Sequence, residues 1–561
     1  MRRTIQTTFL GFTVFLLANN LFTCAAHSQT VDSLNVLSGG TSSDQAAMIN
    51  TVMPLPDGKI LAGGQAIKFI SSGNKSYTNL VCLNSDGSVD TNFSASIGPV
   101  NCIALQTNGQ ILAGGSFSEM NRQTRYNIGR LYANGTLDAS FSAGYVNNSI
   151  YCLLVQPDGK ILVGGTFTMV NSQPCFGLCR LNYDGSLDAN FNAGANGSIK
   201  AIALQPDGRI LVEGSFTSIG GQSRTDFARL YPDGSLDPGF QPVAFQFFGG
   251  PRISGFGGAL WVQPDGKILV GGLFDKVNGL SHTNIVRLNA DGTLDAAFNA
   301  QADLYDCWGL QTLTLQTDGK ILVGDDSLTL DGHPCPYLGR LMADGSLDAG
   351  FNTNLVSSGW MVFSSAVQPD GRILVGGWFD GLGGQTRNGL GRLINTGMAT
   401  QSLDYDGTNI LWLRGGTSPE VWRTSFESST NGTNWTCLGD GCHVDGGWRL
   451  TNVSIATSAV IRARGFVAGG RCDGSSWFVE TSLGPPVPLR FVGINGNPPV
   501  SNGCFNVRLT GAAGSNVVVE CSSDLTTWRP WRTNTLPPGG WDLAMLLGTN
   551  RQQYFRAKHA P

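Results

Sequence analysis

The residues best suited to chemistry in this sequence are aspartates that recur in two sets. One set follows a Ser/Thr-Leu pair, at Asp138, Asp188, Asp237, Asp295 and Asp348. The other set lies in tight Asp-Gly turns, at Asp158, Asp207, Asp265, Asp318 and Asp370. Paired carboxylates are the groups that glycoside hydrolases use. Catalysis needs one asymmetric constellation, however, so residues that return in every repeat are expected to form turns and bond strand ends.

Arginines recur with the same period as the aspartates, at Arg130, Arg180, Arg229, Arg287, Arg340 and Arg392. A charged residue at one position of every repeat predicts a structural belt that pairs with the repeated carboxylates. Ligand binding by this belt is the alternative.

Other catalytic and metal-binding signals are weak. The histidines fall in different loops or modules with no shared spacing, at His27, His282, His333, His443 and His559. No G-x-S-x-G, H-E-x-x-H or phosphate-binding loop occurs in the sequence. We therefore expect no catalytic residue, no metal site and no cofactor.

The aspartates and arginines belong to one unit that is repeated seven times. Each copy has a phrase like Q-P-D-G-K-I-L-V-G-G and a later phrase like R-L-x-x-D-G-S-L-D-x-x-F. The glycines of the first phrase lie about fifty residues apart, at Gly58, Gly109, Gly159, Gly208, Gly266, Gly319 and Gly371. Apolar strands around two tight turns predict four short antiparallel strands per copy, which is a propeller blade. The sequence therefore predicts an all-β fold with a seven-bladed β-propeller.

The two ends of the repeat region predict how the ring closes. The seventh copy lacks the D-G-S-L-D-x-x-F ending, and Val31-Asp32-Ser33-Leu34 near the N-terminus resembles that missing strand. We expect the N-terminal strand to complete the last blade.

These phrases closely resemble the delta-60 repeat, a β-propeller repeat of exported and cell-surface bacterial proteins. The resemblance covers roughly residues 31–400, and seven copies match in order and spacing. It implies a secreted or surface propeller and carries over no catalytic residue. The first copy departs from the pattern, because Cys82 replaces the arginine.

The chain divides into four predicted parts. Residues 1–28 have the positive start, short apolar middle and small residues of a signal peptide, and 29–403 form the propeller. Residues 404–483 and 487–561 are expected to be small β-sandwich-like modules joined by a Pro-rich linker. We expect a secreted or cell-surface protein, with lipidation at Cys24 as an alternative and no transmembrane segment in the mature chain.

Net charge limits the classes of partner that this protein is expected to bind. The net charge is −4 and no basic run occurs, which gives no electrostatic reason to expect nucleic acid. Expected partners are a polysaccharide or a surface protein, bound by a monomer.

Thirteen cysteines in an exported chain suggest a few disulfides. Cys437 and Cys442 are close enough to pinch one loop, and Cys504 with Cys521 would staple the last module. Cys102 occupies the same repeat position as Cys152, so both are expected to be buried strand residues.

Binding residues are expected where the repeats differ. In a four-stranded blade the tight Asp-Gly turns emerge on one face of the ring, the turn face, and the variable connections on the other, the loop face. The variable connections carry aromatic and charged candidates at Phe247, Arg252, Tyr305, Asp306, Trp308 and Trp360. Aromatic rings with a few charges suit sugars or proteins, although phenylalanines that pack under their own loop are an equal alternative.

Two functions follow from these observations, and a purely structural role, such as that of an envelope spacer, is a third possibility. The first is an exported, non-enzymatic propeller that binds or adheres at a surface. The alternative is a carbohydrate-active enzyme, a glycoside hydrolase or lyase with accessory modules, for which Asp303, Asp306, Asp325 and Asp326 are the only dense acids in variable positions.

Overall fold

The structure is a computed structural model of the 561-residue chain. It describes residues 32, 47–70, 76–241, 243–246, 258–304, 309–325, 328–351, 353, 361–456, 458–484, 490–493, 500–501, 504–510, 516–522, 528–535, 541–546 and 554–559. The signal-peptide region and Cys24 lie outside these residues.

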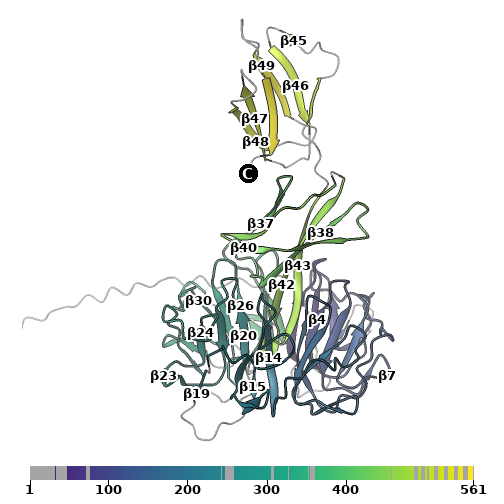
Figure 1. Ribbon diagram of the computed structural model, residues 1–561, viewed down its shortest axis with the longest axis vertical. Helices are drawn as coiled ribbons and strands as arrows, with labels where there is room; N and C mark the ends of the chain where they lie inside the picture. Colours follow the sequence, from purple (N-terminus) through teal and green to yellow (C-terminus); the bar gives the residue numbers. More distant parts are fainter. Residues whose placement is uncertain are drawn as a thin grey trace, which may run out of the picture.

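Seven antiparallel sheets surround one axis and form the predicted propeller (Figure 1). The inner strands are β1 (Met48–Pro54), β4 (Val100–Leu105), β9 (Ile150–Val155), β14 (Ser198–Leu204), β20 (Ala259–Val262), β26 (Thr312–Leu315) and β31 (Met361–Val367). Each inner strand contacts the next, and β31 contacts β1. The ring is therefore complete, and the prediction of a seven-bladed propeller is confirmed.

Two further strands complete the regular part of each blade. The middle strands are β2 (Ile60–Ile70), β5 (Ile111–Gly115), β10 (Ile161–Gly165), β15 (Ile210–Ser215), β21 (Ile268–Gly271), β27 (Ile321–Gly324) and β32 (Ile373–Trp378). The outer strands are β3 (Ser76–Leu83), β8 (Ile128–Leu131), β13 (Leu178–Leu181), β18 (Phe227–Leu230), β24 (Ile285–Leu288), β30 (Leu338–Leu341) and β35 (Leu390–Leu393).

The fourth strand is shorter than the sequence suggests. In blade 2 it is reduced to the bridge between Leu131 and Leu137 and the bond from Asp138 N to Arg130 O. The chain turns away at once because the Asp138 carboxylate accepts the amide of Ser140 and thereby holds a tight turn.

Glycine pairs in the middle strands let neighbouring strands approach closely. A side chain at Gly115 would collide with the carbonyl oxygen of Pro99 on the connection into the inner strand. Only glycine fits at this contact.

Asp32 lies at the seam of the ring, where the N-terminal strand is predicted to close it. Asp32 N donates to Arg392 O at 2.9 Å, which places this residue beside the outer strand of blade 7. The Asp32 carboxylate lies 2.7 Å from Arg392 Nε and 3.3 Å from Arg372 Nε. Asp32 therefore takes the position that the repeated aspartates occupy in blades 2 to 6.

Short ladders build the loop face. The loops between middle and outer strands form the pairs β6 (Glu119–Met120) with β7 (Gln123–Thr124), β11 (Met169–Val170) with β12 (Gln173–Pro174), β16 (Ser218–Ile219) with β17 (Gln222–Ser223), β22 (Lys276–Val277) with β23 (Leu280–Ser281), β28 (Leu328–Leu330) with β29 (His333–Pro334), and β33 (Gly381–Leu382) with β34 (Gln385–Thr386). Two interblade connections add β19 (Phe245–Gln246) and β25 (Ala302–Leu304) to these ladders.

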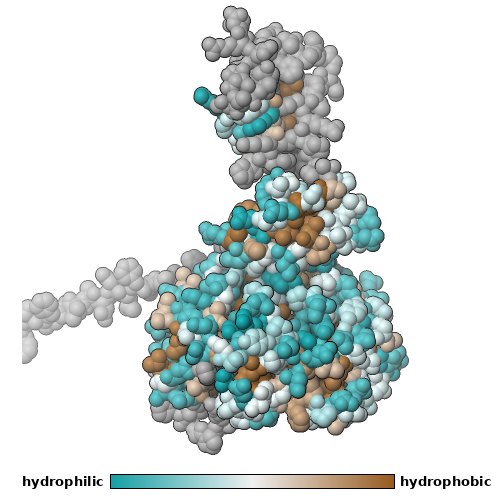
Figure 2. All heavy atoms as spheres, viewed as in Figure 1, coloured by the Kyte–Doolittle hydropathy of each residue, from teal (hydrophilic) through white to brown (hydrophobic). Residues whose placement is uncertain are grey.

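The region after the propeller, residues 399–483, sits on the turn face (Figure 1). Its strands are β36 (Ala399–Tyr405), β37 (Ile410–Gly416), β38 (Arg423–Ser429), β39 (Thr436–Asp440), β40 (Cys442–Val444), β41 (Gly447–Leu450), β42 (Val460–Gly469) and β43 (Ser475–Leu483). Because β36 pairs along its whole length with β37, the expected boundary at residue 404 falls inside a strand. We call residues 399–483 the cap. Figure 2 shows apolar side chains gathered on the cap and a mostly hydrophilic visible flank of the propeller.

The cap docks on the first turn of blade 6. Thr317 N donates to Ser418 O at 2.9 Å, and Glu420 N donates to Leu315 O at 2.9 Å. These backbone hydrogen bonds attach the cap to blade 6 of the propeller.

The hairpin β42–β43 fills the central channel. The 3-10 turn η1 (Arg471–Asp473) joins its strands, and Figure 1 shows the hairpin running down between the blades. Ser476 pairs in parallel with Ala104 of β4, and Gly474 O accepts the amide of Leu153 in β9. The cap is therefore not an independent sandwich, because its central hairpin shares the propeller's interior.

Polar contacts lock the hairpin tip. The Ser475 hydroxyl lies 3.0 Å from Thr51 Oγ1 in blade 1 and accepts the amide of Ile103 in blade 2 at 3.0 Å. On the opposite side, Arg471 Nε donates to Gln311 Oε1 at 3.2 Å. The tip thus bonds to blades on both sides of the axis.

The C-terminal region forms two sheets. The strands of the first are β44 (Arg490–Gly493), β45 (Val500–Ser501), β46 (Cys504–Thr510) and β49 (Trp541–Leu546). The strands of the second are β47 (Asn516–Ser522), β48 (Arg529–Thr535) and β50 (Tyr554–His559). Val507 and Leu509 of one sheet share a core with Val517 and Val519 of the other, which is the packing of a sandwich.

Among the described residues, no helix has the length and apolar character needed to cross a bilayer.

Substituting Asp32→Ala should weaken ring closure. It leaves the buried Arg392 guanidinium without its carboxylate, a change that typically costs about 3–5 kcal/mol. The urea midpoint of unfolding should fall clearly. Asp158→Asn is the control, because Asp158 is an exposed turn residue and asparagine can still accept the amide of Lys160. Equal midpoints for the two variants would contradict closure by Asp32.

Substituting Gly474→Val should unseat the hairpin, because a Cβ there meets the carbonyl oxygen of Tyr151 in blade 3. Gly484→Val is the matched control at the end of the same hairpin, where no atom lies within 4 Å of the added Cβ. Limited proteolysis should cut the cap of the first variant faster than that of the second. Equal cutting rates would show that the channel contacts do not hold the cap.

Candidate functional site

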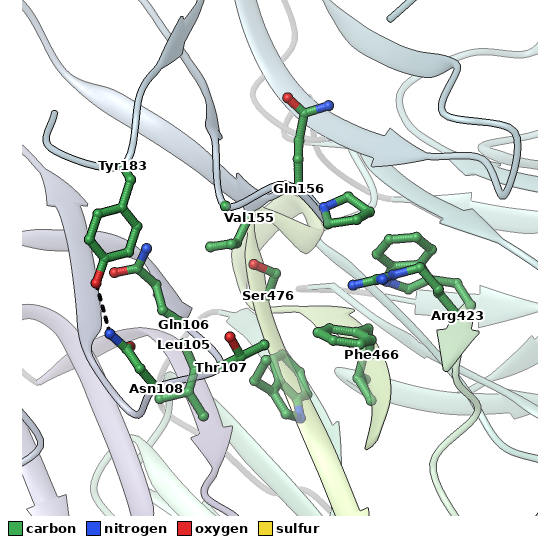
Figure 3. A pocket seen from close by; sticks show the side chains of 15 residues that line it. Leu105, Gln106, Thr107, Asn108, Val155, Gln156, Tyr183, Arg423, Phe466 and Ser476 are labelled. Carbon is green, nitrogen blue, oxygen red and sulfur yellow. Dashed lines mark hydrogen bonds between the residues drawn. The ribbon is translucent and has the colours of Figure 1, made fainter. Parts of the chain in front are cut away.

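A cleft opens where the cap meets blades 2 and 3 (Figure 3). Its volume is about 260 Å³. The propeller contributes the first turns of both blades, including Asn108 and Gln156, together with Tyr183 from the second turn of blade 3. The cap contributes Trp422, Arg423, Phe466, Val467, Ser476 and Trp477. One wall is therefore aromatic, and the other is rich in amides and hydroxyls.

Arg423 is the charged group of this cleft. Its guanidinium carbon lies 3.9 Å from the centre of the Phe466 ring, and NH1 lies 3.1 Å from the Asp440 carboxylate. Burial lowers the pKa of Arg423, and Asp440 acts against that shift. In Figure 3 the side chain reaches into the cleft beside Phe466.

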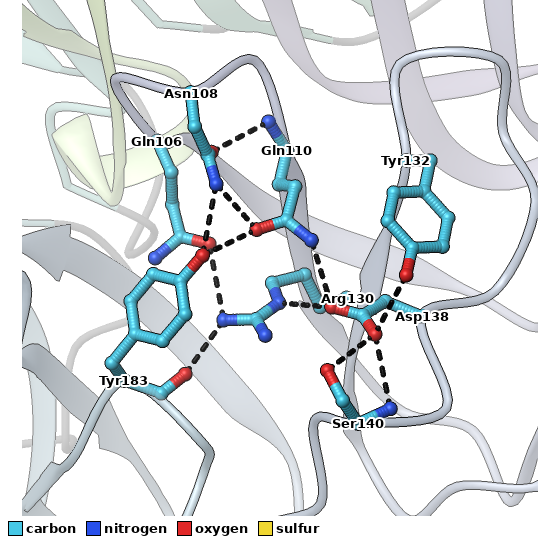
Figure 4. Close-up of polar contacts among 8 residues, drawn as sticks. All are labelled: Gln106, Asn108, Gln110, Arg130, Tyr132, Asp138, Ser140 and Tyr183. Carbon is cyan, nitrogen blue, oxygen red and sulfur yellow. Dashed lines mark hydrogen bonds and ion pairs between the residues drawn. The ribbon is translucent and has the colours of Figure 1, made fainter.

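A clamp of hydrogen bonds holds the propeller side of the cleft (Figure 4). Arg130 Nε donates to Asp138 Oδ2 at 2.8 Å, and NH1 donates to Tyr183 O of the next blade at 2.6 Å. Asn108 Nδ2 donates to the Tyr183 hydroxyl at 2.9 Å. The rim residues Asn108 and Tyr183 are thus fixed by the same network that joins blades 2 and 3.

The clamp recurs around the ring, which confirms the predicted belt and identifies its pairs. The ion pairs are Arg130–Asp138, Arg180–Asp188, Arg229–Asp237, Arg287–Asp295, Arg340–Asp348 and Arg392–Asp32. The same arginines also reach the second turn of the following blade, at Tyr183 O, Pro232 O, Ala290 O, Ala343 O, Asn395 Oδ1 and, from blade 7 back to blade 1, Ser85 O. The repeated acids of blades 2 to 6 therefore serve the scaffold.

Blade 1 lacks the arginine of this clamp. Cys82 stands in its place, and Lys59 Nζ pairs with Asp90 at 3.0 Å, as the equivalent lysines of blades 3, 5 and 6 pair with their aspartates. Lys59 therefore still supplies the Asp90 carboxylate with a positive charge. An ammonium group is a point charge and lacks the planar fork of arginine.

The clamp aspartates are strongly acidic. Burial acts to raise the pKa of Asp138, but hydrogen bonds from Ser140 and Arg130 outweigh it and lower that pKa to about 2. The pKa values of Asp188 and Asp295 are also lowered to about 2 against burial, by bonds from lysine and arginine partners.

A groove between blades 2 and 3 opens on the loop face. Its volume is about 560 Å³, and its lining includes Tyr126, Tyr145, Glu119 and Asn148. The two tyrosine rings meet edge to face at 4.8 Å, and Tyr145 is 46% exposed. We call this the tyrosine groove.

The tyrosine groove breaks the repeat symmetry. The residue that corresponds to Tyr126 is Phe176 in blade 3 and Thr225 in blade 4. A feature found in one blade alone is the kind of asymmetry that recognition requires.

The tip of the channel hairpin carries a buried acid. Asp473 of the tip is 3% exposed, and burial raises its pKa well above the ordinary value. Its Oδ1 accepts the amide of Leu313 at 3.4 Å. This acid is enclosed by the channel and is not presented to solvent.

The six predicted loop-face residues Phe247, Arg252, Tyr305, Asp306, Trp308 and Trp360 lie outside the described residues. Their role stays a prediction. Of the dense acids, Asp306 and Asp326 also lie outside, and Asp325 is buried directly after Gly324 of β27.

The cysteines are thiols wherever the structure describes them. Cys102 and Cys152 are buried strand residues, as expected. Cys437 and Cys442 are exposed free thiols on strands of different sheets, so the expected disulfide is not formed. Cys521 is a free thiol on β47, and Cys504 belongs to β46 of the other sheet.

Among the described residues, no group of three His, Cys, Asp or Glu side chains is placed to hold a metal ion. Sequence reasoning missed the cleft, because its walls come from turns near residues 108 and 156 and from strands more than 250 residues later. The only available signal was the tryptophan-rich composition of the cap.

The clamp should make the stability of the fold depend on pH. A carboxylate with a lowered pKa contributes stability that is complete above its unfolded pKa near 4 and is lost as the pH falls toward 2. The urea midpoint should therefore fall steeply between about pH 4 and pH 2. Asp138→Asn should be less stable at neutral pH and lose less on acidification, and an unchanged pH slope would contradict the clamp's contribution.

Comparison with known proteins agrees with this architecture. The family model of a β-propeller domain of unknown function (DUF5122) matches seven stretches, residues 55–93, 106–141, 156–191, 205–240, 263–298, 316–351 and 368–397. None of the curated proteins compared with this sequence matches it.

Several solved structures are distantly similar. A protein of unknown function from Bacteroides caccae has 14% identity and a TM-score of 0.28, over 52% of this chain and 92% of that one. The structure of YCF48 bound to D1 peptide has 13% identity and a TM-score of 0.31, over 66% and 100%. A glycoside hydrolase has 11% identity and a TM-score of 0.21, over 74% and 92%.

The weak structural likenesses carry no argument about activity. The seven family matches each fall on one blade of the closed ring. The chain is a β-propeller repeat protein.

Proposed function

We propose that this chain is an exported binding protein whose loop face recognises a polysaccharide, without enzymatic activity of its own. The observation that carries the proposal is the position of the cap. The cap docks on the turn face and its hairpin fills the channel, so the loop face is the surface left for a large partner.

The tyrosine groove supports a polysaccharide as the partner. Tyr145 offers an exposed ring, and Glu119 is also exposed. Aromatic rings stack on sugar faces while nearby polar groups bond hydroxyls. A groove of about 560 Å³ has room for a short stretch of chain.

Non-enzymatic binding is supported by the pairing and burial of the acidic side chains. The repeated aspartates of blades 2 to 6 are occupied by arginines, and Asp473 is enclosed in the channel. Export rests on the signal peptide predicted from the sequence.

The test measures retention of the mature chain on a panel of polysaccharides and, in the same tubes, the appearance of new reducing ends. The full mature chain is needed, because a propeller truncated near residue 400 would lack the hairpin that fills its channel. We expect retention without new ends. New reducing ends would instead favour the carbohydrate-active enzyme, and no retention would redirect the search to a protein partner.

The double variant Tyr126→Thr, Tyr145→Ser tests the groove with residues that the repeat itself tolerates. Thr225 occupies the position of Tyr126 in blade 4, and Ser96 occupies that of Tyr145 one blade earlier. Loss of both rings should weaken binding at least tenfold, about 1.4 kcal/mol. Phe176→Thr removes a 50% exposed ring from blade 3 and should leave affinity unchanged. Equal loss in both variants would contradict a specific groove.

A further inference from the structure

The cleft between the cap and blades 2 and 3 is separate from the loop face. It opens on the turn face, where the propeller and cap meet. Its volume of about 260 Å³ is just under the range of about 300–1,000 Å³ that holds drug-sized ligands. A ligand as small as a single sugar residue would suit it.

Two residues that line this cleft carry hydrogen-bond donors without partners. Arg423 Nε and Trp477 Nε1 are both buried, and neither has a hydrogen bond within the part of the chain that the structure describes. Trp477 is only 1% exposed. Buried donors are almost always satisfied in proteins, so each such exception points to a water or ligand.

The charge of the cleft favours an anion. Its fifteen lining residues include Arg423 and no aspartate or glutamate. The Asp440 carboxylate that pairs with Arg423 is 57% exposed and bonds NH1, not Nε. A carboxylate is a natural acceptor for a guanidinium edge.

The remaining walls suit a sugar ring. Phe466 and Val467 form an apolar surface next to Arg423, whereas Thr107 and Tyr183 place hydroxyls at the exposed rim. A free inorganic anion would make no use of the apolar surface. We propose that this cleft binds the carboxylate of an acidic sugar residue, with the guanidinium of Arg423 facing the carboxylate and Phe466 facing the ring.

This site is independent of the loop-face function. It lies on the other side of the ring and uses none of the residues of the tyrosine groove. Tyr126→Thr, Tyr145→Ser should therefore leave it intact, and failure of one proposal does not imply failure of the other.

The test is titration calorimetry of the full mature chain with three probes. Sodium glucuronate carries ring and carboxylate, glucose carries the ring alone, and acetate carries the carboxylate alone. Glucuronate should bind at least tenfold more tightly than either of the others, and added salt should weaken it. If no probe binds, or if glucose or acetate binds as tightly as glucuronate, the proposal is wrong and the donors are satisfied by water or by another ligand.

The repeat supplies a matched pair of variants. Asn108 lies at the cleft rim, at the position where blades 3 to 7 carry Asp158, Asp207, Asp265, Asp318 and Asp370. Asn108→Asp therefore restores the common residue of a turn that folds in other blades, and adds a negative charge beside the ligand. Asn134→Asp makes the same change in the second turn of blade 2, away from the cleft, where other blades also carry aspartate.

Asn108→Asp should weaken glucuronate binding about threefold, since one like charge at the rim acts through water. Asn134→Asp should leave it unchanged, and glucose binding should not respond to either. Arg423→Gln should weaken glucuronate at least tenfold, with the urea midpoint measured alongside to show that the cap remains folded. An equal effect of the two asparagine variants would overturn the proposal.

Discussion

The ion pair between one arginine and one aspartate, present in six of the seven blades, is the interaction on which the rest of this structure depends. Each arginine neutralises the aspartate of its own blade and also bonds the second turn of the following blade. A buried guanidinium needs both partners, because an unpaired charge in the interior is costly. The pair therefore fixes the blade and the angle to its neighbour together. At the seam of the ring, Asp32 supplies the carboxylate from the other end of the chain.

The closed ring creates a channel, and the chain fills that channel with its own hairpin. The tip bonds to inner strands on opposite sides of the axis, through Ser475 and Arg471. The hairpin therefore occupies the channel of the ring. It also joins the propeller and the cap into one packed unit. A fragment that ends near residue 400 would lack the hairpin that fills the channel. The cleft of Arg423 exists because the cap is docked.

The seven blades act as internal controls for function. A residue that recurs at one repeat position, such as Asp138 or Arg130, is explained by the scaffold. A residue that departs from its equivalents needs another explanation, as do Tyr126 on the loop face and Asn108 at the cleft. Substituting the residue of another blade tests such a departure with little risk to folding, because the backbone already accepts that residue elsewhere in the ring.

Much of the fold could be predicted because the same local sequence pattern recurs seven times. The features that could be predicted are the Asp-Gly turns, the alternating strands and the orphan strand around Asp32. They depend on short-range interactions or on simple complementarity between repeats, so the sequence pattern alone indicates them. The length of the fourth strand was overestimated, because the Asp138 carboxylate turns the chain sooner than strand propensity suggests. The disulfides were inferred from proximity in sequence, whereas Cys437 and Cys442 belong to different sheets. The channel hairpin and the cleft arise from contacts between residues hundreds of positions apart, such as Thr51 with Ser475. No local pattern encodes such contacts, since they depend on how complete surfaces fit once the ring has closed.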